Sequence, residues 1–234
     1  MKRRSYLITF ILLIMVPLSA CSALEADLQN AKKDYEGGNY ETAYAGFRSA
    51  AKWGYAEARY YLGLMHENGQ GTEVDFSEAA KWYLEAARQG YSPAQNALGI
   101  LHIKGQGASP HPDDAQRWFR MAADQGYASA YYNLGLMYYL GEGVTRDYSE
   151  AAKWVRKAAD KGILKAQISL SMAYQFGQGV DQDYVMAYMW MDLGSSDGNE
   201  EAIDTLNVMA ASMTPEQIKR ARALAAQWRA KREK

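Results

Sequence analysis

One segment of this 234-residue sequence matches a pattern used by serine hydrolases. The sequence GSSDG, from Gly194 to Gly198, has the G-x-S-x-G form in which a central serine, here Ser196, acts as the nucleophile. That pattern works at a sharp turn between a β-strand and a helix. Here it lies between two stretches with helical periodicity. We therefore expect no catalytic residue in this chain.

Histidines at regular spacing raise the question of a metal site. His66 and His102 are 36 residues apart, but Tyr138 and Tyr174 occupy the same position at the next two intervals. This column indicates an aromatic packing position. His111 alone cannot complete a ligand set, and no cysteines or carboxylates stand at ligand spacing. The glycine-rich GxG segments lack the strand and the longer motif of a phosphate-binding loop. We expect neither a metal nor a cofactor.

Cys21 is the only cysteine and follows an export signal. The chain starts with the charged sequence KRR, and an apolar run spans residues 6–16, which is too short for the roughly 20 residues of a membrane-spanning helix. This predicts a secretory signal peptide over residues 1–20. The sequence LSAC resembles the bacterial lipobox, which implies acylation of Cys21 and a membrane anchor. The alternative is a free thiol near an ordinary cleavage site.

The resemblance also suggests where the protein is located. Ser22 follows the cysteine, and in Gram-negative lipoproteins this fits export to the outer membrane, facing the periplasm. We therefore expect a lipid-anchored protein of the bacterial cell envelope. Its formal net charge of -1 offers no excess of basic groups for phosphate contacts, so we expect no nucleic-acid partner.

The clearest feature of the sequence is an internal repeat of 36 residues. Apolar residues at helical spacing, such as Ala58, Leu62 and Met65, predict a first helix in each unit. A segment that starts with an acid, such as the one from Asp147, predicts a second helix, and no strand pattern is found. The glycines and tryptophans that keep the period are Gly54, Gly90, Gly126, Gly162, Trp82, Trp118, Trp154 and Trp190.

Glycine also interrupts the first helix of three units. Gly63, Gly99 and Gly135 each cost about 1 kcal/mol relative to alanine, and Ser171 takes their place in the fourth unit. We expect the second helix to approach closely there, with its paired alanines as the matching smooth face. We expect the tryptophans to fill the space between successive units.

The segment AAKWYLEAARQGYSPAQNALGILHIKGQG resembles the Sel-one-like repeat, a relative of the tetratricopeptide repeat. The resemblance covers roughly residues 40–200 and implies an all-α fold, a right-handed α/α superhelical solenoid of helix-turn-helix repeats. After the signal we expect a partial repeat or cap, four units and C-terminal capping helices, at residues 22–53, 54–89, 90–125, 126–161, 162–197 and 198–234.

The end of the chain carries the start signal of a last helix. Thr214 is the expected N-cap, Pro215 the first helical residue and Gln217 the partner of the cap. The face expected to dock on the solenoid consists of Ile218, Ala221, Leu224, Ala225 and Trp228.

In tetratricopeptide relatives, one side of the first helix lines a concave groove that holds a partner's peptide or helix, and the resemblance implies the same here. Tyrosine suits interfaces because it offers a large contact area with few rotamers. The competing explanation is that tyrosines only cover helix edges. The expected partner-binding residues are Glu57, Tyr60, Tyr61, Asn96, Tyr132, Asn133, Tyr139, Lys165 and Gln175.

These observations favour a protein-binding module that is not an enzyme. In a sharper form the partner is a toxin effector and the chain an immunity protein, because lipoproteins that resemble it include proteins that neutralise secreted toxins. Two alternatives stay open. One is an envelope enzyme, of the cell-wall hydrolase or β-lactam-binding type, and the other is a structural scaffold of a polysaccharide or secretion assembly.

Overall fold

The computed structural model describes residues 18–107, 110–196 and 198–232, and within these ranges every regular element is an α-helix. The fold is therefore all-helical, as predicted. The helices are α1 (Leu18–Glu36), α2 (Tyr40–Lys52), α3 (Ala56–Asn68), α4 (Phe76–Arg88), α5 (Ser92–Lys104), α6 (Pro112–Asp124), α7 (Ala128–Leu140), α8 (Tyr148–Asp160), α9 (Leu164–Phe176), α10 (Tyr184–Gly194), α11 (Glu200–Ala211) and α12 (Pro215–Arg232).

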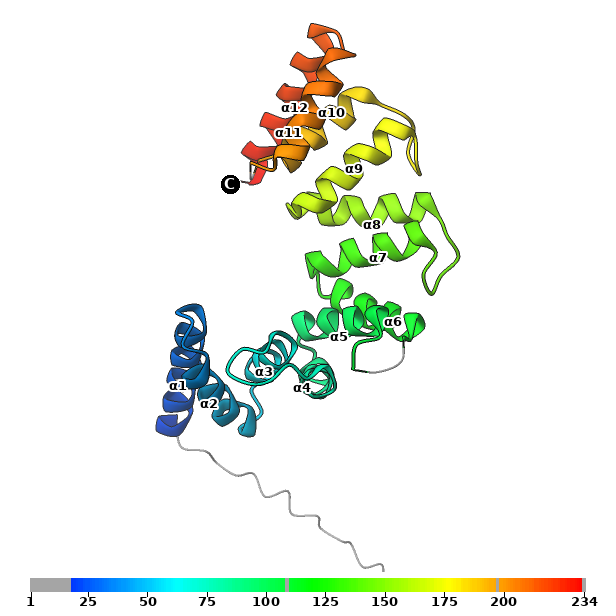
Figure 1. Cartoon of the computed structure of the whole chain (residues 1–234). Helices are drawn as coiled ribbons and strands as arrows, with labels where there is room; N and C mark the ends of the chain where they lie inside the picture. The colour runs from blue at the N-terminus through cyan, green and yellow to red at the C-terminus, as the bar shows by residue number, and fades with distance from the viewer. Residues whose placement is uncertain (1–17, 108–109, 197, 233–234) are drawn as a thin grey trace, which may run out of the picture.

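Successive helices form hairpins that stack into a curved array, with α1 at one end and α12 at the other (Figure 1). In the four repeat units the hairpins are α3 with α4, α5 with α6, α7 with α8 and α9 with α10. The second helix of each hairpin also packs on the first helix of the next. In the repeat units, substantial contacts therefore join helices that are neighbours in the chain, which is the arrangement of a solenoid, and at the C-terminal end α12 also packs on α10.

The second helices begin at a column of acids that cap them. The carboxylate of Asp75 accepts a hydrogen bond from the backbone N–H of Glu78, and Asp147 does the same for Glu150. Such a cap satisfies one of the free N–H groups at a helix start. In the second unit His111 takes this position, and its side chain makes no capping hydrogen bond.

The GxG loops let the chain turn between the two helices of a unit. Gly69 ends α3 with a φ of 67°, in the left-handed region that favours glycine. The second glycine of the loop, Gly71, also leaves no room for a side chain, because a Cβ there would lie 2.6 Å from the carbonyl oxygen of Tyr40. The loop therefore packs against the start of α2 in the preceding hairpin.

The glycines within the first helices allow the close approach that the sequence predicted, but the partner differs. A Cβ on Gly63 would lie 2.5 Å from the ring of Tyr83 on α4, and one on Gly99 would lie 2.6 Å from the ring of Phe119 on α6. In the first two units an aromatic ring, and not the paired alanines, fills the contact. Ser171 on α9 instead donates a 2.6 Å hydrogen bond to the carbonyl oxygen of Ala187.

The hydrophobic core is a chain of small clusters joined by the tryptophan column. Trp82 on α4 packs against the cluster around Phe47 of the preceding hairpin and Leu62 of its own hairpin. Trp118 and Trp154 each pack in the same way one unit further on. The tryptophans therefore fill the space between units, as predicted.

The C-terminal helices close the array as the sequence predicted. The hydroxyl of Thr214 accepts a 3.2 Å hydrogen bond from the backbone N–H of Gln217, whose side-chain oxygen accepts one of 2.9 Å from the N–H of Thr214. The predicted face of α12 packs on the last core cluster, where Trp228 meets the buried Trp190 edge-to-face with ring centres 6.0 Å apart. Arg229 forms a 2.8 Å ion pair with Asp192.

The predicted signal peptide falls almost entirely on residues 1–17, which lie outside the described residues. Cys21 lies within α1, which begins at Leu18. In the part of the chain that the structure covers, no helix has the length and apolar character needed to span a bilayer.

Candidate protein-binding groove

Helices α7 and α9 lie on either side of an apolar pocket of about 170 Å³. Leu136 and Tyr139 line it from α7, and Met172 lines it from α9. Its floor is α8, where Ala151 and Val155 lie below the gap. The small residues of α8 leave the space open, because a larger side chain at Ala151 would extend into it.

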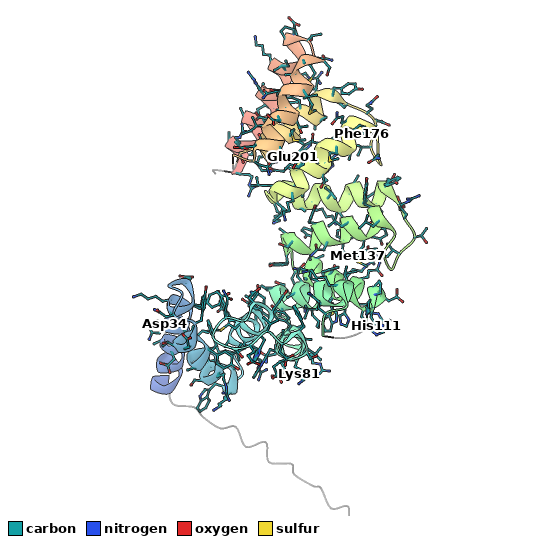
Figure 2. All side chains as sticks on the ribbon, in the orientation of Figure 1. Asp34, Lys81, His111, Met137, Phe176 and Glu201 are labelled. Carbon is teal, nitrogen blue, oxygen red and sulfur yellow. The ribbon has the colours of Figure 1, made fainter. Side chains whose placement is uncertain are left out.

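Two further pockets extend this one in both directions. Between α5 and α7, Ile100 and Leu136 line a pocket, and between α9 and α11, Met172, Phe176 and Glu201 line another. Figure 2 labels Met137 at the pocket between α5 and α7, and Phe176 and Glu201 at the pocket between α9 and α11. Leu136 lines both the pocket between α7 and α9 and the pocket between α5 and α7, and Met172 lines both the pocket between α7 and α9 and the pocket between α9 and α11. The three pockets therefore adjoin one another along α5, α7, α9 and α11, and we call this strip the apolar groove.

The apolar groove exposes side chains that soluble proteins usually bury. Leu140 is 56% exposed, Met172 49% and Phe176 59%, and Tyr139 is 42% exposed beside them. Charged groups lie at the rim, where Lys104 and Glu142 border the pocket between α5 and α7. A contiguous apolar strip with a polar rim is typical of a protein-binding surface.

Three of the predicted partner-binding residues line the apolar groove. Tyr139 lines its centre, and its ring lies 5.3 Å from that of Tyr148. Asn133 lines the pocket between α5 and α7, and Gln175 the one between α9 and α11. A fourth predicted residue, Lys165, is exposed near the start of α9 but does not line these three pockets.

Other predicted residues join neighbouring units. Asn96 is only 7% exposed, and its side-chain oxygen accepts a 2.8 Å hydrogen bond from Asn133. Glu57 forms a 2.7 Å ion pair with Lys32 on α1. Tyr132 is partly buried against the core cluster of the last units.

Tyr60 and Tyr61 also contact their own chain. The ring of Tyr61 stacks on Phe47 with centres 4.6 Å apart. The ring of Tyr60 packs against those of Tyr83 and Tyr91, and burial raises the pKa of Tyr60 well above its ordinary range. In the first units these tyrosines hold the hairpins together.

Four of the apolar residues that line the apolar groove were missed by the sequence analysis. Leu136, Leu140, Met172 and Phe176 are apolar, and their helical spacing resembles that of core positions. A signal was present, because the column of Leu64, Ile100, Leu136 and Met172 stays apolar although it lies beside the buried stripe and outside it.

The histidines and the serine that the sequence analysis considered as metal ligands or a nucleophile lie at packing and turn positions. His66 lies 3.1 Å from the hydroxyl of Tyr44 through its Nε2, and the ring of His102 packs near that of His111. Among the described residues, no three of the ligand-bearing types gather into a metal site. Ser196 is exposed after the end of α10, and no strand precedes it in residues 18–107 or 110–195.

Comparison with a solved structure supports a common architecture. A Sel1 repeat protein from Oxalobacter formigenes is 31% identical, with a TM-score of 0.67, and the match covers 76% of this chain and 74% of that one. The immunity protein Pa5087 from Pseudomonas aeruginosa is 18% identical with a TM-score of 0.55, over 88% of this chain and 82% of that one. At this low identity the second likeness shows the fold alone.

A shorter match links the chain to a curated protein. "Putative beta-lactamase HcpE" from Helicobacter pylori is 44% identical over 45 residues, which are 19% of this chain and only 13% of that protein. The family described as Sel1 repeat matches four consecutive segments, at residues 56–91, 92–127, 128–163 and 164–199. Because these segments make up more than half of the sequence, the chain belongs to the Sel1 repeat family.

Proposed function

We propose that this protein is a binding module whose apolar groove holds a segment of a partner protein. The main support for the proposal is that three apolar pockets adjoin one another, with Leu136 and Met172 each lining two of them. Leaving such side chains in water forgoes about 25 cal/mol for each Å² that a partner would cover. A partner that covers these side chains would therefore gain binding free energy from apolar burial.

The shape and chemistry of the groove favour an amphipathic helix or an extended apolar segment. Such segments insert a row of apolar side chains into a groove while their polar side remains in solvent. Met172 has a flexible, polarizable side chain that adapts to different partners. The rim charges Lys104, Glu142 and Glu201 would then set the register of the segment.

Crosslinking in the native cells, followed by purification and mass spectrometry, tests this proposal. The double variant Met172→Glu and Phe176→Glu places two charges in the groove at exposed positions, so folding should be retained. Val208→Glu is the matched control, because Val208 is 72% exposed on α11 and does not line the groove. We expect a specific partner with the natural chain and the control, and at least a tenfold loss with the double variant.

Equal recovery of the partner with the double variant and the control would exclude the apolar groove as the binding site. We propose binding without catalysis, and the exposed position of Ser196 after α10 supports this. Ser196→Ala should leave the cellular function unchanged. Loss of function in a folded Ser196→Ala variant would favour the envelope enzyme instead.

A sharper proposal is that the partner is a secreted toxin and this chain its immunity protein. Its support is the shared fold with the Pseudomonas immunity protein Pa5087. Coexpression with candidate toxins tests it, with growth as the readout. Protection should require Met172 and Phe176 and should survive Val208→Glu. Recovery of a polysaccharide or secretion assembly, without any protection, would favour the structural scaffold.

We also propose that the chain is anchored in the bacterial cell envelope by a lipid on Cys21. The support is the sequence LSAC after the apolar run at residues 6–16. Mass spectrometry of the N-terminal peptide from membranes should find an acylated Cys21. Cys21→Ser should move the protein into the soluble fraction, and an unmodified cysteine in membrane-bound protein would contradict the anchor.

A further inference from the structure

Trp53 is a large aromatic side chain in an exposed position. It follows α2 as its C-cap and is 59% exposed, whereas Trp190 is 2% exposed and Trp82, Trp118 and Trp154 pack between units. The fold does not require an aromatic residue there. The equivalent residues one, two and three repeats later are Gln89, Gln125 and Lys161.

Trp53 lies at the end of the α1–α2 hairpin where the chain enters α1. A Cβ on Gly46 would lie 2.8 Å from the Cβ of Ala31, so these two residues are level in the hairpin. Trp53 is seven residues after Gly46, and residue 24 is seven residues before Ala31. Figure 1 shows that α1 and α2 run in opposite directions. Counting from the contact between Gly46 and Ala31, Trp53 is therefore level with residue 24. The backbone of Cys21 is then only about 5 Å further along the helix axis.

The charges along this edge of the solenoid change sign with distance from Trp53. Lys52 ends α2 and Arg88 ends α4, but the same position holds Asp124 in α6 and Asp160 in α8. The exposed acids Glu25 and Asp27 on α1 offset the nearby bases. The edge near Trp53 is therefore close to neutral, and an aromatic side chain is its distinctive feature.

We infer that this end of the α1–α2 hairpin faces a lipid bilayer and that Trp53 sits among the lipid headgroups. Tryptophan prefers this interface because its ring is apolar while its N–H needs a polar partner. The inference rests on the proposed membrane anchor, which would hold the same end of the hairpin at the bilayer. Trp53 then acts as a second contact and fixes the direction in which the solenoid leaves the membrane.

Quenching of tryptophan emission by brominated lipids tests the inference. The protein is purified from membranes of the producing cells and reconstituted into neutral phosphatidylcholine vesicles that carry bromine close to the headgroups. Trp53→Gln is the key variant, because glutamine is the natural residue at this position in the next two units. Val208→Gln is the control for loss of an exposed apolar side chain elsewhere.

We expect bromine to quench the natural chain and the Val208→Gln control equally. Trp53→Gln should remove at least four fifths of that quenching, because the other five tryptophans lie within the repeats or the C-terminal cap. Quenching that is absent in the natural chain, or unchanged by Trp53→Gln, would overturn the inference.

The N-terminal peptide of the same preparation separates this inference from the proposed anchor. A protein without an acyl group but with quenching due to Trp53 would contradict the lipid anchor and support the bilayer contact, since an uncut signal peptide enters α1 at the same end. An acylated protein without quenching due to Trp53 would support the anchor and overturn the contact.

Discussion

Asn133 on α7 donates a 2.8 Å hydrogen bond to Asn96 on α5, and this bond joins two neighbouring units beside the apolar groove. Asn133→Ala should lower the free energy of unfolding by about 1 to 3 kcal/mol, because it leaves the buried oxygen of Asn96 without a partner. Urea denaturation measures the change. Ser169→Ala is the control at the same position two helices later, and should change stability by less than about 0.5 kcal/mol. Equal losses would show that the bond contributes nothing specific.

The contact between Gly63 and Tyr83 predicts a penalty for alanine in the middle of α3. Gly63→Ala gains about 1 kcal/mol of helix propensity but should destabilise the protein by about 1 to 3 kcal/mol overall, because the new methyl group meets the ring of Tyr83. Combining it with Tyr83→Leu should cost less than the sum of the single changes. Additive losses in thermal unfolding would argue against the clash.

His111 offers a test of the capping column. His111→Asp should stabilise the protein by about 1 kcal/mol, because aspartate is the cap at the equivalent position in the other three units. Asp147→Ala, the reverse change, should cost a similar amount. Both shifts are measurable by urea denaturation at neutral pH. A destabilising His111→Asp would mean that the loop before α6 cannot present the cap.

The histidines of the first helices predict lower stability in acid. Burial lowers the pKa of His66 and of His102 below the ordinary value of 6.5, although Asp75 and Glu78 near His66 act in the opposite direction. As the pH falls through 6.5, the unfolded chain therefore binds more protons than the folded chain, and the free energy of unfolding falls. The stabilising contribution of the neutral histidines is complete only above that pH.

Tyrosine replaces histidine in the same column of the third and fourth units, so His66→Tyr with His102→Tyr is a conservative change. The double variant should show a smaller loss of melting temperature between pH 7 and pH 5 than the natural chain. Parallel pH profiles for the two proteins would refute the assignment to these histidines.

The contact between Trp190 and Trp228 predicts that α12 protects the last unit. Trp228→Ala should cost about 3 kcal/mol and shift the emission of Trp190 to longer wavelength as water reaches it. Arg229→Ala removes a partly exposed ion pair with the Asp192 carboxylate and a hydrogen bond to the Asp192 backbone oxygen, and should cost less than about 1 kcal/mol. Similar costs for the two changes would indicate that α12 is held mainly by charge.

The sequence predicted the features that depend on local chemistry. The cap at Thr214 with Gln217 involves residues three apart in the chain. The periodic glycines and tryptophans recur at a fixed interval. Both features can therefore be recognised from the order of the residues alone. The same holds for the docking of Trp228, which lies on the single apolar face of the last helix.

The site was harder to predict because exposure depends on how the units stack. Leu136 and Leu134 are both apolar and two residues apart, yet Leu134 is fully buried while Leu136 lines the apolar groove. Tyr61 was expected on the binding side, and it stacks on Phe47 of the preceding hairpin. Periodicity shows that a helix has an apolar side but does not show which part of that side a neighbouring unit covers.

The stacking of each repeat hairpin on its neighbours has an evolutionary consequence. Because the repeat hairpins pack mainly on the one before and the one after, adding or removing a single 36-residue unit recreates the same junctions at the new boundary. One duplication can therefore change how far along a ligand the protein reaches, while the side chains of every existing unit stay as they are.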